Sequence, residues 1–424
     1  MNEAYRRAVE RIRSRGRFGS LGLGRMERVA AALGHPERAF RTAHIAGTNG
    51  KGSTAAFLEN ILRQSGHRVG LYTSPHVVDW RERVQVDREW IAEADVIRHL
   101  AAIEGAQGEA GDPLTEFEIW TLMAFLAFRE AEVDIAVVEV GLGGRLDATN
   151  IVTPDACAIT TVSLDHVERL GPDIPSIAFE KAGILKPGVP AVLGSLVPEA
   201  LAVVTRRAHE VGAPLLRLGH EIALVPHGKG QALEALGTRV VLEPSLSGRH
   251  QVDNAAVAAT MALLLEPGVR PAAIEAGVSQ CRLSGRLEVL QKSPPVVADA
   301  AKNVMGMQAL GAYLDREYPS LGVRLLFGCL GERNPAALLE PLAGRVTRLA
   351  VHALDDGRAL PMEDLVAAAA QVGLVPEEAP TIEECLAFLG ATGKGEVGVA
   401  AGSFYLVGPL IAAWNRSRIG SVQA

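Results

Sequence analysis

Short apolar runs alternate with amphipathic segments along the first half of the chain. Four runs are almost continuously apolar, as strands buried on both faces of a parallel sheet are, and they cover residues 43–46, 69–72, 135–140 and 156–162. Two further segments space their apolar residues as helices do, residues 54–64 and 119–128. Gly66 stands where the C-cap of the first helix is expected. The alternation predicts an α/β fold whose mostly parallel sheet is flanked by helices.

The alternation stops in a polar stretch with two prolines, residues 290–295, and then restarts. The later apolar runs are residues 296–298, 323–328, 348–353 and 397–401. We therefore expect a P-loop-type, mostly parallel sheet domain over residues 1–290. A smaller Rossmann-like α/β domain is expected over residues 296–424, with a cleft between the two.

Composition narrows the class of protein. The 424 residues are 48% hydrophobic and 21% charged, as in soluble globular proteins, and the net charge of −7 argues against nucleic acid as the main partner. No apolar run reaches membrane-spanning length, and residues 1–20 lack the apolar core of a signal peptide. The four cysteines show no C-x-x-C spacing, which indicates buried, reduced thiols and neither disulfides nor a zinc site. These features predict a cytoplasmic protein.

A glycine-rich loop between the first strand and the first helix is the strongest chemical signal. Its candidate phosphate-binding residues are Gly47, Thr48, Asn49, Gly50, Lys51, Gly52 and Ser53. Glycines let successive backbone N–H groups turn toward one anion, a lysine adds a point charge, and a hydroxyl can reach Mg²⁺. The spacing departs from G-x-x-x-x-G-K-[ST], because Gly52 separates Lys51 from Ser53. A glycine loop without function is the alternative, but the strand–loop–helix context favours binding of a nucleoside triphosphate.

Three more polar residues follow the expected strands, at the edge where open α/β sheets bind ligands. They are Ser74, Glu139 and His166. Glu139 ends an apolar strand, as the acid that positions Mg²⁺ in phosphate-loop enzymes does. Taken singly, Glu139 could be a surface acid and His166 an ordinary loop histidine. Together with the loop they predict a metal–triphosphate site.

Ten motifs in order give the chain a family resemblance. They are LGLGRM at 21–26, GTNGKGS at 47–53, TSPH at 73–76, LTEFE at 114–118, EVGLGGRLDATN at 139–150, LDH at 164–166, EKAGI at 180–184, HQVDNAA at 250–256, GRLE at 285–288 and GSFYLVG at 402–408. The chain resembles folylpolyglutamate synthase and dihydrofolate synthase, members of the Mur ligase superfamily of ATP-dependent amide-forming enzymes. The resemblance covers nearly the whole chain.

The resemblance implies a metal site with two Mg²⁺ ions. Ser74, Glu139 and His166 match the family's Mg²⁺ ligands, and Ser53 is a further candidate. Lys181 matches a lysine that the family carries as a carbamate, an anion able to hold the second Mg²⁺ through oxygen. Without its flanking motif, Lys181 would read as a surface lysine in a Glu-Lys helix pair. With the resemblance, Lys51, Lys181 and His166 are the expected catalytic residues.

Other positions match binding residues of the family. Asn254, Arg286 and Asp299 match nucleotide-binding positions, and Leu23, Phe117 and Asp147 match the region that holds the pterin. Lys302 and Ser403 fall in the part of the second domain implied to bind the remaining substrates.

The implied reaction has two steps. A substrate carboxylate takes the γ-phosphate of ATP and becomes an acyl phosphate, and the amino group of glutamate then displaces phosphate. The expected partners are therefore small molecules (pteroate or folate, glutamate and ATP with Mg²⁺), without nucleic acid or membrane, and a monomer is expected. The sequence is compatible with dihydrofolate synthesis, with extension of glutamate tails, and with both.

Two departures from the family affect the second substrate. Where the family usually reads Asp-Gly-Ala-His-Asn-Pro, residues 299–304 place Lys302 at the histidine and lack the glycine and proline. In residues 327–334, Glu, Arg and Asn replace the usual Asp, Lys and Asp. Two alternatives therefore stay open: a related ligase that uses another amino acid or acid, and a nucleotide-binding paralogue that has lost catalysis.

Overall fold

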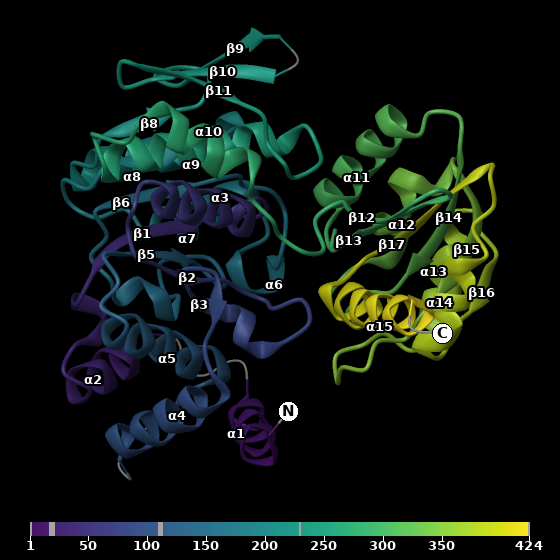
Figure 1. Cartoon of the computed structure of the whole chain (residues 1–424), viewed down its shortest axis with the longest axis horizontal. Coiled ribbons are helices and arrows are strands. Elements are labelled where there is room, and N and C mark those ends of the chain that lie inside the picture. Colours follow the sequence, from purple (N-terminus) through teal and green to yellow (C-terminus); the bar gives the residue numbers. More distant parts are fainter. Residues whose placement is uncertain (1, 17–21, 109–112, 229, 423–424) are drawn as a thin grey trace. The chain divides into compact units, whose positions relative to one another are not determined.

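The computed structural model describes residues 2–16, 22–108, 113–228 and 230–422, which form two compact units (Figure 1). Unit 1 consists of residues 1–245 and 251–282, and unit 2 consists of residues 246–250 and 283–424. The chain therefore crosses between the units three times.

An eight-stranded sheet forms the centre of unit 1. Its strands, in chain order, are β1 (Arg41–Ala46), β2 (Val69–Tyr72), β3 (Val84–Val86), β4 (Glu89–Trp90), β5 (Ile135–Glu139), β6 (Ala156–Ile159), β7 (Ala191–Leu193) and β8 (Leu215–Arg217). Their order in the sheet is β4-β3-β2-β5-β1-β6-β7-β8, and only the pairings of β3 are antiparallel. Strands β1, β5 and β6, which carry or flank the expected site, lie together at the centre.

Helices cover this sheet, and one extends from the glycine-rich loop. The helices of unit 1 are α1 (Glu3–Arg13), α2 (Gly24–Ala32), α3 (Lys51–Gln64), α4 (Glu93–Gln107), α5 (Glu116–Glu130), α6 (Val167–Leu170), α7 (Ile174–Ala182), α8 (Pro198–Val211), α9 (His250–Leu265) and α10 (Pro271–Ser279), with the 3₁₀ turns η1 (Pro36–Arg38), η2 (Trp80–Arg83) and η3 (Ala148–Ile151). Helix α3 begins after Gly50 and ends before Gly66, whose φ of 94° suits the residue after a C-cap. Thr115 and Glu118 form a reciprocal capping box that starts α5.

A small antiparallel sheet in unit 1 was not expected from the sequence. It joins β9 (Ala223–His227), β10 (Gly230–Ala235) and β11 (Thr238–Leu242) in the order β11-β10-β9. Strand β9 is mostly exposed, so it lacks the apolar run that marks a buried strand. Helix α10 lies between α3 and β11 and connects this sheet to the layer that carries the glycine-rich loop (Figure 1).

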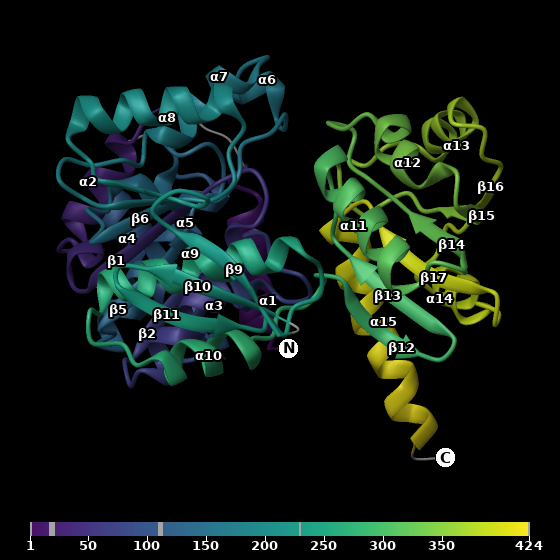
Figure 2. The same cartoon turned by 90° about the horizontal axis from the view of Figure 1, so that it is seen from above.

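Unit 2 contains a six-stranded sheet with helices on it (Figure 2). The strands are β12 (Glu288–Lys292), β13 (Pro295–Asp299), β14 (Gly322–Phe327), β15 (Val346–Val351), β16 (Pro376–Glu378) and β17 (Glu396–Ala401). The helices are α11 (Val304–Glu317), α12 (Pro335–Ala343), α13 (Met362–Gln371), α14 (Ile382–Gly390) and α15 (Phe404–Val422). The sheet order is β12-β13-β17-β14-β15-β16, and only β12 runs antiparallel to its neighbour.

The polar stretch at residues 290–295, expected to separate the two domains, lies inside unit 2, the main part of which begins at residue 283. Its first residues complete β12, and Ser293 and Pro294 form the turn into β13, so the stretch is a hairpin inside the second sheet. A proline at such a turn removes no hydrogen bond from the ladder, which is why it does not mark a linker here. The predicted α/β class, with a larger mostly parallel sheet followed by a smaller α/β unit, is confirmed.

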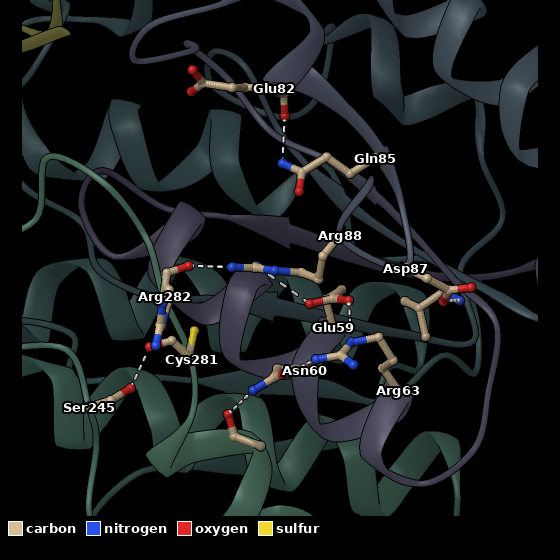
Figure 3. Close-up of polar contacts among 12 residues, drawn as sticks. Glu59, Asn60, Arg63, Glu82, Gln85, Asp87, Arg88, Ser245, Cys281 and Arg282 are labelled. Atoms are coloured by element: carbon tan, nitrogen blue, oxygen red, sulfur yellow. Dashed lines mark hydrogen bonds and ion pairs between the residues drawn. The ribbon is translucent and has the colours of Figure 1, made fainter. Parts of the chain in front are cut away.

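Polar contacts anchor the second half of α3 (Figure 3). Asn60 donates through Nδ2 to the carbonyl of Gly277 in α10 at 2.7 Å. Arg88 contacts Glu59 of α3 and also donates to the backbone carbonyl of Arg282, the last residue of unit 1. The helix that begins at the glycine-rich loop is thus tied to the point where the chain leaves unit 1.

Candidate active site

The glycine-rich loop connects β1 to α3 in a conformation that requires glycine at two positions. Gly47 has a φ of 154°, and a Cβ on it would lie 1.9 Å from Oγ1 of Thr160. Gly50 has a φ of 86°, and a Cβ there would lie 2.4 Å from Oδ1 of Asn254. Both the backbone conformation and the neighbouring side chains therefore exclude larger residues. Asn254 of α9, a predicted nucleotide-binding residue, is placed directly against the loop.

The segment after β6 makes several hydrogen bonds to the glycine-rich loop. The backbone N–H of Thr48 donates to the carbonyl of Thr161 at 2.8 Å, and Asn49 and Thr161 exchange two hydrogen bonds of 3.0 Å through the threonine hydroxyl. The Thr160 hydroxyl donates to the Asn49 carbonyl at 2.6 Å. Ser163 donates its N–H to the Thr48 hydroxyl at 3.1 Å. The same segment continues to His166. One stretch of chain therefore makes hydrogen bonds to the loop and carries this predicted metal ligand.

Two lysines meet at one carbonyl of the loop. Nζ of Lys51, the first residue of α3, donates to the Gly47 carbonyl at 3.1 Å, and Nζ of Lys181 from α7 donates to the same oxygen at 3.0 Å. Lys181 is only 3% exposed, so it is not the surface lysine of a helix pair. The structure therefore brings two of the three predicted catalytic residues together at the loop.

Predicted metal ligands lie at the carboxyl ends of two adjacent strands. Glu139 is the last residue of β5, and its Oε2 accepts the N–H of Ser74, which follows β2, at 3.1 Å. Both residues supply oxygen atoms, the ligands that Mg²⁺ prefers. His166 starts α6 with a φ of 52°, and its Nε2 lies 3.8 Å from Oδ1 of Asp165. Ser53 is buried in the first turn of α3.

These residues fit a magnesium-bound nucleotide. Gly50, as N-cap of α3, has no side chain to accept the first N–H groups of the helix, which are therefore suited to an anion such as phosphate. Lys51 lies beside this helix end, and the Glu139 carboxylate lies at the carboxyl end of a strand next to β1. Backbone donors, a cation and a carboxylate are the donor set that a metal-bound triphosphate needs.

The predicted pterin-region residues come from elements that contact one another. Leu23 is the N-cap of α2, which packs on both η3 and α5. Phe117 of α5 is so near Gly141 that a Cβ there would lie 2.4 Å from the Phe117 ring. Asp147 is the buried N-cap of η3. Leu21 of the same N-terminal motif lies outside the described residues.

Asp147 is held by its own loop. Its Oδ2 accepts the Leu142 N–H at 2.8 Å, and its Oδ1 accepts the Thr149 hydroxyl at 2.5 Å. Burial raises the pKa of the Asp147 carboxyl, while the hydrogen bonds from Thr149 and from the Leu142 backbone lower it.

In unit 2, Arg286 and Asp299 are close in space. Oδ2 of Asp299, at the end of β13, accepts the Leu287 N–H at 2.7 Å, and Oδ1 accepts the Ala301 N–H at 2.8 Å. The Arg286 guanidinium lies 4.5 Å from the centre of the Phe404 ring. Burial raises the pKa of Asp299, and the charge of Arg286 lowers it.

Lys302 and Ser403 follow neighbouring strands of the second sheet. Lys302, half-buried, comes three residues after the end of β13, and buried Ser403 comes two residues after the end of β17. These strands pair in parallel, so both residues lie at the carboxyl edge where α/β sheets bind ligands. The Ser403 hydroxyl accepts the Tyr405 N–H at 3.1 Å and so caps the start of α15.

Comparison with known proteins places the chain in a family. The Mur ligase middle domain matches residues 45–262, and the Mur ligase glutamate ligase domain matches residues 285–404. The dihydrofolate synthase/folylpolyglutamate synthase of Bacillus subtilis is 34% identical, over 96% of this chain and 98% of that protein. The Escherichia coli protein of the same name is 39% identical, over 75% of this chain and 74% of its own length.

Solved structures agree with this result over nearly the full length. A Mycobacterium tuberculosis folylpolyglutamate synthase complexed with ADP superposes with a TM-score of 0.91 at 30% identity, covering 97% of this chain and 98% of that one. An Escherichia coli FolC in complex with DHPP and ADP gives a TM-score of 0.90 at 31% identity, covering 99% of this chain and 100% of that one. The predicted resemblance is confirmed, and with it the class of ATP-dependent ligase. The chain belongs to the dihydrofolate synthase/folylpolyglutamate synthase family of Mur ligases.

Proposed function

We propose that this protein adds L-glutamate to the carboxyl group of dihydropteroate or a folate, using ATP and an acyl-phosphate intermediate. The observation that carries the proposal is the meeting of Lys51 and Lys181 at the Gly47 carbonyl, beside strand ends that present Ser74 and Glu139. A nucleotide site built in this way serves phosphoryl transfer, which depends on positioning and on neutralised charge.

In the first step, the carboxylate of the substrate displaces ADP from the γ-phosphate of ATP. Backbone N–H groups at the start of α3 hold the phosphates, and Lys51 neutralises the charge that develops on them. Ser53, Ser74, Glu139, His166 and a carbamoylated Lys181 would hold two Mg²⁺ ions. When bound, Mg²⁺ would neutralise the charge of the phosphates and help to orient the attacking and leaving oxygens for in-line transfer. Relatives support the metal: the Yersinia pestis enzyme was solved with AMPPNP and Mn.

In the second step, the glutamate amino group attacks the acyl carbonyl, and phosphate leaves. Unit 1 would bind ATP and the pterin acid, the latter through Leu23, Phe117 and Asp147. Unit 2 would bind glutamate through Lys302 and Ser403, and its Arg286 and Asp299 are the proposed nucleotide-binding residues of that unit. The neighbouring positions of Lys302 and Ser403 at one sheet edge support a shared role in binding carboxylates.

A second candidate function keeps the chemistry and changes the amino acid. Lys302 favours it, because a lysine is a cation at neutral pH and cannot act as the neutral imidazole of the family's usual histidine. The same cation can also pair with a side-chain carboxylate, so glutamate remains the first candidate.

The experiment is ADP release with purified protein, MgATP and glutamate, with dihydropteroate or tetrahydrofolate as acceptor. Product is identified by the mass gain of one glutamyl residue, and Glu139→Gln serves as the inactive control. Turnover with either acceptor supports the proposal, and the ratio of the two rates assigns the main activity. If neither acceptor gives ADP while another amino acid restores turnover, the second function replaces the first.

We also propose that the enzyme works in the cytoplasm as a monomer. The four cysteines are buried and unbonded, which suits a reducing compartment. Within the described residues no helix has both the length and the apolar character needed to cross a bilayer.

A further inference from the structure

His44 is a fully buried titratable residue with no assigned role. It lies in β1, three residues before Gly47, and is 0% exposed. Its Nε2 lies 2.8 Å from Oγ1 of Thr149, a residue of η3 that is also 0% exposed. The strand that leads into the phosphate loop thus contacts the loop that carries Asp147.

The direction of each hydrogen bond in this chain is determined by Asp147. Its Oδ1 accepts both the N–H of Thr149 at 3.1 Å and the Thr149 hydroxyl at 2.5 Å, while Oδ2 accepts the Leu142 N–H at 2.8 Å. A carboxylate in this role only accepts hydrogen bonds, so the Thr149 hydroxyl uses its one O–H to donate to Asp147. The hydroxyl oxygen must then act as the acceptor in its contact with His44, and the Nε2–H of His44 is the donor.

The surroundings of His44 keep the ring in this one form. Burial, together with the smaller effect of the Lys186 charge, lowers the pKa of His44 to about 3, so the ring is neutral throughout the physiological range. Among the described residues, Nδ1 has no hydrogen-bond partner, so a proton on that atom would be buried without an acceptor. A neutral ring with its proton on Nε2 is the form that leaves no donor unsatisfied.

We propose that His44 and Thr149 are positioning residues that hold the Asp147 carboxylate in the orientation that binds N–H donors of the acid substrate's heterocyclic head group. The inference rests on the proposed function, since it assumes that Asp147 contacts that substrate. The Thr149 hydroxyl fixes one carboxylate oxygen, and His44 prevents the hydroxyl from rotating away. The carboxylate rotamer is then set before substrate arrives, which lowers the cost of binding.

Two matched pairs of variants test this. Thr149→Val removes the hydroxyl at constant shape, whereas Thr149→Ser retains it. His44→Leu removes the donor, whereas His44→Gln can place an amide N–H near the position of Nε2. Steady-state kinetics give KM for the acid substrate, KM for ATP and kcat, and melting temperature with ADP reports folding. Asp147→Asn is measured beside them.

We expect Thr149→Val and His44→Leu to raise KM for the acid substrate about tenfold, as the loss of one charge-assisted hydrogen bond does, with KM for ATP within about twofold of wild type. Thr149→Ser and His44→Gln should restore most of the loss. Rescue by the donor-retaining member of each pair is a result that a purely space-filling role would not give. If one apolar variant fails to fold, the other pair of variants still tests the positioning role.

The failures are distinguishable. If Asp147→Asn raises KM for the acid substrate but Thr149→Val and His44→Leu do not, the positioning role is wrong and the proposed function stands. If Asp147→Asn leaves that KM unchanged in an active ligase, the assumed substrate contact is wrong, and the positioning role falls with it. As an independent check, ¹⁵N NMR of the His44 ring should show a neutral ring protonated on Nε2 from pH 5 to 9, and a charged ring would also overturn the inference.

Discussion

Glu59 and Arg88 form an ion pair in unit 1, with Oε2 of the buried acid 3.5 Å from Nη1 of the partly exposed arginine (Figure 3). Glu59 has no exposed side-chain surface and lies in α3, the helix that starts at Lys51. Its Oε1 lies 3.4 Å from Nε of Arg63, an ion pair without hydrogen-bond geometry. Burial raises the pKa of Glu59 to about 7, although the charges of Arg88 and Arg63 lower it and that of Asp87 raises it.

The raised pKa predicts a pH-dependent stability. Between its ordinary pKa of 4.5 and about 7, Glu59 keeps its proton in the folded chain and loses it in the unfolded chain. Its favourable contribution is therefore complete below pH 4.5 and lost as the pH rises to about 7. Glu59→Gln should gain about 2–3 kcal/mol in unfolding free energy relative to wild type between pH 4.5 and 8. Urea unfolding over this pH range measures the difference.

Two variants control this experiment. Glu10→Gln makes the same chemical change at an exposed position of α1 and sets the baseline. Arg88→Gln removes a charge that lowers the pKa of Glu59, so the loss of stability should extend to higher pH. A wild-type to Glu59→Gln difference that is the same at pH 4.5 and pH 8 would contradict the assignment.

Gly47→Ala should damage the nucleotide site. The new Cβ would lie 1.9 Å from Oγ1 of Thr160 in a backbone conformation that side chains disfavour, so the loop must move. We expect ADP affinity to fall at least about tenfold, as measured by calorimetry. Gly66→Ala at the other end of α3 is the matched control: its φ is also positive, but a Cβ there meets no atom within 4 Å. The control should cost about 1 kcal/mol of stability without changing ADP affinity. Equal ADP affinity in both variants would show that the loop accommodates a side chain.

Local sequence signals located the phosphate loop and the strand-end residues. The strand–loop–helix unit contains Gly47 and Lys51, and an apolar strand ends at Glu139. Both features can be predicted from residues that are neighbours in the sequence. The strand bounds agree with the apolar runs to within a few residues, because strands buried on both faces must be apolar throughout.

Contacts between distant segments were not accessible in this way. In the sequence, Thr160 and Thr161 are indistinguishable from ordinary polar residues after a strand. Their hydrogen bonds reach loop residues more than 100 positions earlier in the chain; Thr160 and Asn49, for example, are 111 positions apart. Glu59 has the pattern of a surface acid on a helix, and its partner Arg88 is 29 residues away. His44 looks like any polar residue at a strand, since its hydrogen bond to Thr149 spans 105 positions. Each of these interactions forms only when segments that are distant in the sequence come together in the tertiary structure.

The cysteines should resist alkylation until the chain unfolds. All four are buried, and burial raises the pKa of each thiol to about 12. The thiolate is the reactive form, so both access and ionisation are low at pH 8. Iodoacetamide followed by mass spectrometry should show labelling at least about 100-fold slower in native than in urea-unfolded protein. Rapid labelling of any one cysteine in the native protein would show that its site opens to solvent.

Lys302→Met is predicted to weaken binding of the amino acid substrate. Methionine keeps most of the length of the side chain and removes the charge, so the loss reports a contact with a carboxylate. We expect KM for glutamate to rise about 10- to 100-fold while KM for ATP stays within about threefold of wild type. Lys394→Met, at an exposed position of the same unit, is the matched control and should leave both constants unchanged. Lys302→His, which installs the family's usual residue, should bind glutamate more weakly than wild type at pH 8, where the imidazole is neutral, and regain affinity near pH 6. If Lys302→Met leaves KM for glutamate unaltered, the incoming amino acid is held by other groups at the carboxyl edge of the second sheet.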